Sequence, residues 1–354
     1  MSLEKLRGEI DRIDEKILKL LNSRAGEALK VNRIKRDKKI RTYSPDREET
    51  MLKRLKGLSK GLFKAQDTEN VFREILSACR AQNANIKIAY LGPEHTFTHI
   101  AALKKFGKSV DYLECSSIAD VFTEVERGRA DYGVVPIENS TEGAVNHTLD
   151  MFLDSELKIC SEMYLSIEHN LLSRCKKISS VKNVYSHQQV FAQCRKWLEK
   201  NLPNAKLTSY TSTTQAAMYA TLGKGRAAIA SKAAAEEYEL NILARSIEDS
   251  AHNITRFLII GRQDVGSTKQ DKTSIVFSMK DKAGALHDAL VPFKRNNINL
   301  TKIESRPSKK KAWKYYFFVD MQGHKDSPPV RKAIRALEKE CLFVKILGSY
   351  PKES

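Results

Sequence analysis

The chain has 354 residues, of which 41% are hydrophobic, and its formal net charge at pH 7 is +18. This length predicts two or three domains, and no apolar run approaches the roughly 20 residues that a membrane-spanning helix needs. The six cysteines include no C-x-x-C pair, and the first residues, MSLEKLRGEIDRIDEK, are charged from the start. These features argue against a signal peptide and predict a cytoplasmic protein with reduced thiols.

The excess of Lys and Arg predicts anionic partners. Proteins that bind nucleic acid gather such charge into a stripe with interleaved aromatic residues, whereas here it is spread along the whole chain. The densest cluster, residues 309–314, falls between two expected strands and is interpreted as a solvated hairpin loop. The charge distribution therefore favours small anions over nucleic acid.

Residues 1 to about 83 have a helical pattern without strands. Apolar residues recur at alternating spacings of three and four from Leu3 to Leu20, which indicates one apolar stripe on a long helix. Ser44 and Pro45 predict the start of a second helix with Ser44 as its cap, and Asp67 is expected to cap a third. Three such helices bury little apolar surface by themselves, which predicts an intertwined dimer.

From Ile86 to Gly261 short apolar runs alternate with helical stretches, which predicts an α/β domain. Pro136 is expected to stop one buried strand, and residues 138–143 are expected to form a polar loop after it. Other strand ends carry similar polar tips. Ligands bind at the carboxyl ends of strands in α/β sheets, and helix N-termini favour anions. The tips therefore predict a polar, anionic ligand held without a metal or cofactor.

After Gly266 a third unit begins. Strands are expected at residues 273–279, 300–304, 313–321 and 343–347, and helices at 286–294 and 330–340. This βαββαβ order is ferredoxin-like.

Two patterns invite other interpretations. Residues 223–228 fit G-x-G-x-x-A, but a dinucleotide fingerprint follows a strand and opens a helix, whereas here a helix is expected before it and a strand after it. His95 and His99 have the spacing of a zinc pair, but no third ligand is evident. We interpret both histidines as ordinary loop and helix residues.

The first helix places cations on its apolar stripe. At about 100° per residue, Arg24 falls in line with the stripe and Lys35 lies within about 20° of it. A buried unpaired charge costs several kcal/mol, so either these side chains snorkel at the stripe edge or they hold an anion between helices. Arg7 lies about 25 Å from Arg24 along the axis, so only a partner's copy could reach the same site.

These residues belong to a recognisable pattern. The segments LRGEIDRIDEKILKLLNSR, VNRIK and YSPDREE resemble the all-helical chorismate mutase family, in which a swapped dimer binds chorismate. The resemblance implies stabilisation of charge on the substrate's ether oxygen, largely by Lys35. The implied catalytic positions are Arg7 (from the partner), Arg24, Lys35, Arg47 and Glu48. The chain departs from the family at Ser44 (usually an acid), Cys79 (usually Ser) and Asn83 (usually Gln, here at Gln82 beside it).

Five segments of the α/β region, YLGPEHTFTHIAA, VVPIENSTEGAVN, VYSHQQVFAQC, TSTTQAA and ITRF, resemble prephenate dehydratase in their order along the chain. The resemblance implies two α/β lobes around a cleft, like a periplasmic binding protein. It makes Thr255 the key hydroxyl, which positions the substrate and protonates the departing oxygen. The implied substrate-binding residues are Thr96, Asn139, Ser140, Thr141, Gln189, Ser212 and Thr213, with Asn83 in the mutase site.

The third unit resembles the ACT regulatory domain, in which phenylalanine binds at a dimer interface. The matching motifs are GAL and ESRP, and the implied effector residues are Gly284, Ala285, Leu286, Asn299, Glu304, Ser305, Arg306 and Pro307. A module that serves dimerisation alone is the alternative interpretation.

Taken together, the resemblance implies a multidomain, bifunctional enzyme of phenylalanine biosynthesis. Its expected parts are a helical mutase domain at residues 1–84, a dehydratase domain at 86–262 and an ACT domain at 271–352. The implied partners are chorismate, prephenate, phenylalanine as effector and a second copy of the chain, in a dimer or a dimer of dimers, with no nucleic acid and no membrane.

Three alternative functions are also compatible with parts of the sequence. Arogenate, the amino analogue of prephenate, would suit a dehydratase with a weakened mutase, and the sequence leaves this open. A prephenate dehydrogenase needs a dinucleotide fingerprint in the right context. A solute-binding or nucleic-acid-binding protein is disfavoured by the charged N-terminus and by the dispersed charge.

Overall fold

The computed structural model describes residues 2–38, 43–82, 86–250, 252–308 and 315–353. The chain divides into two compact units. The first comprises residues 1–86 and 105–111, and the second comprises residues 87–104 and 112–354. Among the described helices, none combines the length and the apolar character that crossing a membrane requires.

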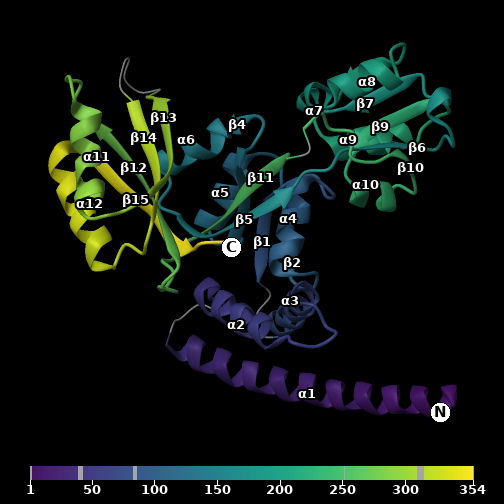
Figure 1. The fold of residues 1–354 in the computed structure, drawn as a ribbon, viewed down its shortest axis with the longest axis horizontal. Helices are drawn as coiled ribbons and strands as arrows, with labels where there is room; N and C mark the ends of the chain where they lie inside the picture. Colours follow the sequence, from purple (N-terminus) through teal and green to yellow (C-terminus); the bar gives the residue numbers. More distant parts are fainter. Residues whose placement is uncertain (1, 39–42, 83–85, 251, 309–314, 354) are drawn as a thin grey trace. The chain divides into compact units, whose positions relative to one another are not determined.

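The first unit contains the three expected helices, α1 (Leu3–Asp37), α2 (Pro45–Leu58) and α3 (Ala65–Ala81) (Figure 1). The cap of α2 is the predicted residue, whereas the cap of α3 is not. Ser44 occupies the cap position of α2, but its side chain makes no capping bond and instead accepts a hydrogen bond from Lys35. Lys64 stands at the cap of α3. Asp67 lies inside the first turn, where a carboxylate is favoured by the helix dipole.

The second unit begins with a lobe built on a mixed sheet in the order β2-β1-β3-β11-β5, with β4 paired to β3. Strand β11 runs antiparallel to both of its neighbours, while β1 and β3 are parallel. The elements of this first lobe are β1 (Lys87–Leu91), α4 (Phe97–Phe106), β2 (Asp111–Cys115), α5 (Ile118–Glu126), β3 (Tyr132–Asn139), β4 (Gly143–Ala144), α6 (Asn146–Asp154), β5 (Lys158–Ser166) and β11 (Ile254–Gly261).

Pro136 does not end its strand, contrary to the sequence prediction. Strand β3 continues to Asn139 because the pairing with β11 shifts register there: Arg256 lies opposite Glu138, but Phe257 lies opposite Pro136. Such a bulge tolerates a residue that has no N–H to donate. The polar segment is thus a hairpin tip between β3 and β4, and Gly143 turns the chain with a φ of +83°.

The second lobe has a sheet in the order β10-β6-β9-β7-β8. The chain enters this lobe after β5 and returns from it to β11, so the two-lobed α/β expectation is confirmed. Its elements are β6 (Asn170–Ser173), β7 (Asn183–Ser186), α7 (Gln188–Gln193), α8 (Arg195–Asn201), β8 (Lys206–Ser209), α9 (Thr213–Ala220), β9 (Arg226–Ala230), α10 (Lys232–Glu237) and β10 (Asn241–Ala244).

The C-terminal layer (Asp271–Pro351) has the predicted βαββαβ order and an antiparallel sheet arranged β13-β14-β12-β15. Helices α11 and α12 cover one face of this sheet (Figure 1). Its elements are β12 (Asp271–Met279), α11 (Ala285–Arg295), β13 (Leu300–Pro307), β14 (Tyr315–Gln322), α12 (Pro328–Glu340) and β15 (Cys341–Pro351).

The other face of the C-terminal sheet packs on the first lobe. Val276, Phe318 and Leu347 belong to the same buried apolar cluster as Ile137 and Phe152. The linker expected after Gly266 therefore joins two layers that share a hydrophobic core, rather than separating independent bodies.

Candidate functional sites

Strands β3 and β11 bring Asn139 and Thr255 directly opposite each other. Nδ2 of Asn139 donates to Thr255 Oγ1 at 2.8 Å and to Asn253 Oδ1 at 2.8 Å. Oδ1 of Asn139 accepts from the backbone N–H groups of Thr141 (2.9 Å) and Glu142 (3.1 Å), which fixes the orientation of the amide. Since Thr255 Oγ1 is an acceptor in this arrangement, its own proton is free to be donated to another group.

Helix α7 of the second lobe reaches the tip of this hairpin. Nε2 of Gln189 and of Gln193 donate to the two carboxylate oxygens of Glu142, at 3.3 and 3.1 Å. Oε1 of Gln193 accepts from Asn253 at 3.1 Å. Sequence reasoning identified Gln189 but missed Gln193, although residues four apart lie on the same face of a helix.

A second residue that sequence reasoning missed is His169, which belongs to none of the recognised motifs. Its Nε2 lies 2.7 Å from Gln193 Oε1, and its backbone N–H donates to Glu248. Because Gln193 Oε1 can only accept, Nε2 of His169 carries the ring proton and Nδ1 does not. Burial lowers the pKa of His169, and Nδ1 has no hydrogen-bond partner among the described residues.

Several predicted substrate-binding side chains form hydrogen bonds to nearby backbone groups. Ser140 Oγ accepts from the N–H of Ile254 and donates to the carbonyl of His252. Thr96 Oγ1 donates to the carbonyl of Leu91, and Ser212 Oγ caps α9. These residues shape the loops around the candidate site.

The two threonines at the start of α9 are buried, unlike the exposed polar residues of the hairpin tip. Thr213 is buried, as is the neighbouring Thr214, whose Oγ1 has no hydrogen-bond partner within the described part of the chain. Thr214 belongs to the TSTTQAA segment but was not among the predicted substrate-binding residues.

The His95–His99 pair and the 223–228 segment have ordinary structural surroundings. His99 Nδ1 accepts from the backbone N–H of His95 at 2.9 Å, and its ring stacks on Tyr90. The 223–228 segment follows α9 and runs into β9, in the reverse of the dinucleotide-binding order, as expected.

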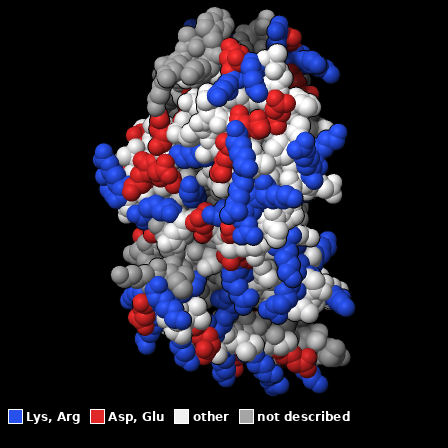
Figure 2. Space-filling model, turned by 90° about the vertical axis from the view of Figure 1, so that its left-hand side faces the viewer, with Lys and Arg blue, Asp and Glu red and all other residues white. Residues whose placement is uncertain are grey.

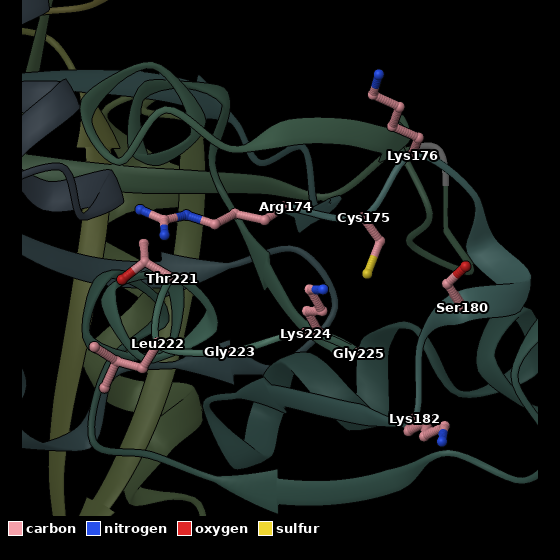
Figure 3. A pocket seen from close by; sticks show the side chains of 10 residues that line it. All are labelled: Arg174, Cys175, Lys176, Ser180, Lys182, Thr221, Leu222, Gly223, Lys224 and Gly225. Carbon is pink, nitrogen blue, oxygen red and sulfur yellow. The ribbon is translucent and has the colours of Figure 1, made fainter.

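Part of that glycine segment lines a basic pocket of about 710 Å³ (Figure 3). The pocket lies beside the amino ends of β7 and β9, and none of the predicted site residues lines it. Its lining residues include Arg174, Lys176, Lys182 and Lys224. Charge is mixed elsewhere: on the face shown in Figure 2, Lys and Arg are interspersed with Asp and Glu.

In the helical unit, Arg24 contacts residues of α2 and α3, and Lys35 contacts the residue that precedes α2. Nη1 of Arg24 lies 3.1 Å from Cys79 Sγ, and Lys35 Nζ donates to Ser44 Oγ at 3.0 Å. Burial lowers the pKa of Lys35, an effect that the carboxylates of Asp46 and Glu48 oppose.

The remaining predicted mutase residues do not all gather around Arg24 and Lys35 in a single chain. Arg7 is exposed near the start of α1, Arg47 is exposed on α2, and Asn83 lies outside the described residues. Glu48 forms an ion pair with Arg80, a buried cation that sequence reasoning missed. The signal for Arg80 was its position four residues after Leu76, in line with the apolar face of α3.

The predicted effector residues separate into two groups. Gly284, Ala285 and Leu286 line a pocket of about 510 Å³, together with Met279, Tyr315, Phe317 and Leu342. Asn299, Glu304, Ser305, Arg306 and Pro307 do not line it. Asn299 lies at the opposite end of β13, where its carbonyl accepts from Gln322, and Arg306 pairs with Asp150.

Models of three protein families match the chain in succession. Chorismate mutase type II matches residues 6–84, prephenate dehydratase matches 88–265, and the ACT domain matches 273–339. A protein of Aquifex aeolicus is 51% identical over 99% of this chain and 98% of its own length, and one of Pseudomonas aeruginosa is 46% identical over the same shares. Both are bifunctional chorismate mutase/prephenate dehydratases.

A solved structure is similar to most of the chain. It is a prephenate dehydratase from Arthrobacter aurescens in complex with L-Phe, with a TM-score of 0.70 and 34% identity. The match covers 75% of this chain and 90% of that one.

Proposed function

The chain belongs to the family of bifunctional chorismate mutase/prephenate dehydratases, and we propose that the residues brought together above carry its two reactions. The helical unit rearranges chorismate to prephenate, and the two-lobed unit converts prephenate to phenylpyruvate. The names of the relatives favour prephenate over arogenate as the substrate of the second step.

The Asn139–Thr255 pair is the observation that carries the dehydratase assignment. In this reaction the ring carboxylate leaves as carbon dioxide, its bonding electrons enter the ring, and the ring hydroxyl departs as water once it is protonated. Asn139 donates to Thr255 Oγ1 and so leaves the hydroxyl proton of Thr255 free for the departing oxygen. A hydroxyl is a weak acid, so positioning is most of the role of Thr255.

The polar residues around this pair bind the substrate. Thr141 and Gln189 present side chains at the hairpin tip and at α7, while Ser140, Ser212 and Thr96 hold the backbone that surrounds them. Thr213 contributes from the start of α9.

In the mutase, Arg24 binds a carboxylate of chorismate and Lys35 stabilises the charge that develops on the ether oxygen. Arg47 and Glu48 complete the site from α2, together with Asn83, which lies outside the described residues. Arg7 comes from a second copy of the chain, because it lies about 25 Å from Arg24 along α1.

The apolar stripe of α1 supports this dimer. Ile10, Ile13 and Leu20 are 56%, 53% and 69% exposed in a single chain. A second copy would remove this surface from water. The predicted assembly is a dimer or a dimer of dimers. The domain boundaries at 1–84, 86–262 and 271–352 and the cytoplasmic location also stay predictions.

Phenylalanine acts as a feedback inhibitor at the C-terminal layer. The pocket beside Gly284 combines backbone for the amino-acid group with the apolar side chains of Leu286 and Leu342 for the ring. Asn299 and Ser305 of a second copy would complete it, since those of the same chain do not line it.

The test is an assay in which chorismate is supplied and both chorismate loss and phenylpyruvate formation are followed. Thr255→Val keeps the side-chain shape and should abolish most dehydration while leaving the mutase rate intact. Lys35→Ala should lose most mutase activity on chorismate. It should still convert prephenate to phenylpyruvate at a near-normal rate when prephenate is supplied directly. Loss of both activities in either folded variant would contradict the assignment of separate sites.

A further inference from the structure

A cluster of buried charges joins the dehydratase sheet to the C-terminal layer. Arg256 Nη1 lies 2.6 Å from Asp320 Oδ2 of β14, and Arg256 Nη2 lies 2.8 Å from Glu162 Oε2 of β5. Lys272 Nζ of β12 lies 2.8 Å from the same oxygen of Glu162. Tyr350 Oη accepts from Arg256 at 3.0 Å. All five residues are buried.

A second ion pair lies beside this cluster. Lys302 of β13 contacts Glu138 of β3, and the same Glu138 oxygen is 3.6 Å from Arg256 Nη1. Burial by itself lowers the pKa of Arg256, but Tyr350, Asp320 and Glu162 together raise it, so the guanidinium stays charged.

The two anchored residues are the immediate neighbours of the proposed site. Glu138 precedes Asn139 on β3 and Arg256 follows Thr255 on β11, and the two pairs lie opposite each other in the sheet. Because successive side chains of a strand point to opposite faces, Glu138 and Arg256 face the C-terminal layer while Asn139 and Thr255 face the other way.

We propose that Lys302 and Asp320 of the C-terminal layer are positioning residues of the dehydratase reaction, which hold β3 and β11 in the register that aligns Asn139 with Thr255. The proposal rests on the assignment of Thr255 given above. The hydrogen bond between Asn139 and Thr255 spans two strands, so a small slip between the strands would break it. A misplacement of about 1 Å at a reacting group can cost a hundredfold in rate.

Strand β13 carries both Lys302 and part of the predicted effector motif, so the same contacts could transmit effector binding. Its residues alternate between half-buried and exposed: Lys302, Glu304 and Arg306 are half-buried, while Ile303 and Ser305 are exposed. Lys302 and Arg306 contact Glu138 and Asp150 of the first lobe. A displacement of β13 by an effector would thus act directly on the strand that carries Asn139.

The experiment compares two matched lysines. Lys302→Met removes the contact to Glu138. Lys345→Met removes the contacts of a similarly buried lysine of the same layer, which pairs with the exposed Glu156 and donates to the carbonyl of Ser155, away from the site. The side chains of Lys302 and Lys345 are 15% and 12% exposed. We expect Lys302→Met to lower the dehydratase kcat about tenfold or more, with KM and the mutase rate little changed, and Lys345→Met to leave kcat near normal.

Lys302→Arg should restore most of kcat, because the ion pair to Glu138 can form again. In a Thr255→Val background Lys302→Met should add little, because it acts through Thr255. Equal effects of Lys302→Met and Lys345→Met, or a normal kcat for Lys302→Met, would overturn the proposal. A normal kcat for Thr255→Val would instead overturn the assignment of Thr255, so the two failures are distinguishable.

Discussion

Asn139 is the side chain on which the proposed dehydratase site converges. It donates to Thr255 and Asn253 and accepts from Thr141 and Glu142, so its amide has one allowed orientation. That orientation decides which way the hydroxyl proton of Thr255 points. An asparagine in this place differs from an aspartate in one respect that matters for catalysis, since only the amide has protons to donate.

Asn139→Asp is expected to reduce dehydration strongly while the protein stays folded. The carboxylate keeps an acceptor for the N–H groups of Thr141 and Glu142, but it would accept the proton of Thr255 instead of donating to it. Steady-state kinetics with prephenate measure the effect, and circular dichroism checks the fold. An Asn139→Asp enzyme with the turnover of the unsubstituted protein would mean that the proton of Thr255 plays no part.

Strand β15 is the element that fits the C-terminal layer most closely to the first lobe. Its Gly348 faces the backbone of Ile159 on β5, and an added Cβ would overlap the carbonyl oxygen of Ile159. Lys158 Nζ also donates to the carbonyl of Ile346 at 3.1 Å. The two layers approach so closely here because glycine has no side chain, and no flexible neighbour can move aside.

Gly348→Ala is therefore expected to destabilise the second unit by about 1–3 kcal/mol, the usual cost of overpacking. The matched control is Gly223→Ala, whose Cβ would meet only the flexible side chain of Arg226 at 3.3 Å. Thermal unfolding should show a lower midpoint for Gly348→Ala than for the control. Indistinguishable midpoints would show that the two layers can move apart to accommodate the added methyl group without loss of stability.

At the scale of the whole molecule, we predict that the mutase site needs two chains. No residue of α1 is buried in a single chain, and Arg7 lies far along the helix from Arg24 and Lys35. If the helices of two copies exchange, each site combines Lys35 of one chain with Arg7 of the other.

Mixed dimers test this directly. Arg7→Ala and Lys35→Ala should each lack most mutase activity. Refolded together in equal amounts, they should recover about a quarter of it, because half of the dimers are mixed and each has one intact site out of two. Recovery requires Arg7 to act across the dimer; no recovery in mixtures that light scattering shows to be dimeric would place both residues in one chain. Dehydratase activity serves as the measure of refolded protein.

The sequence by itself determined the elements and their order. Periodicity located α1, α4 and the βαββαβ layer, because a helix or strand that buries one face must repeat its apolar residues at 3.6 or 2 positions. Polar segments at strand ends predicted a ligand site, and their resemblance to prephenate dehydratase implied Thr255, Asn139 and Gln189.

The tertiary structure alone decided the contacts between distant segments. Pro136 was expected to end a strand, but the bulge opposite it depends on pairing with β11, more than a hundred residues away in the chain. Arg80, His169 and Gln193 carry no local signal of their partners. The buried cluster of Arg256, Glu162 and Asp320 is drawn from three strands, and the charges are stable there only because each meets its opposite. Such complementarity is a property of packing, which no single segment of the sequence contains.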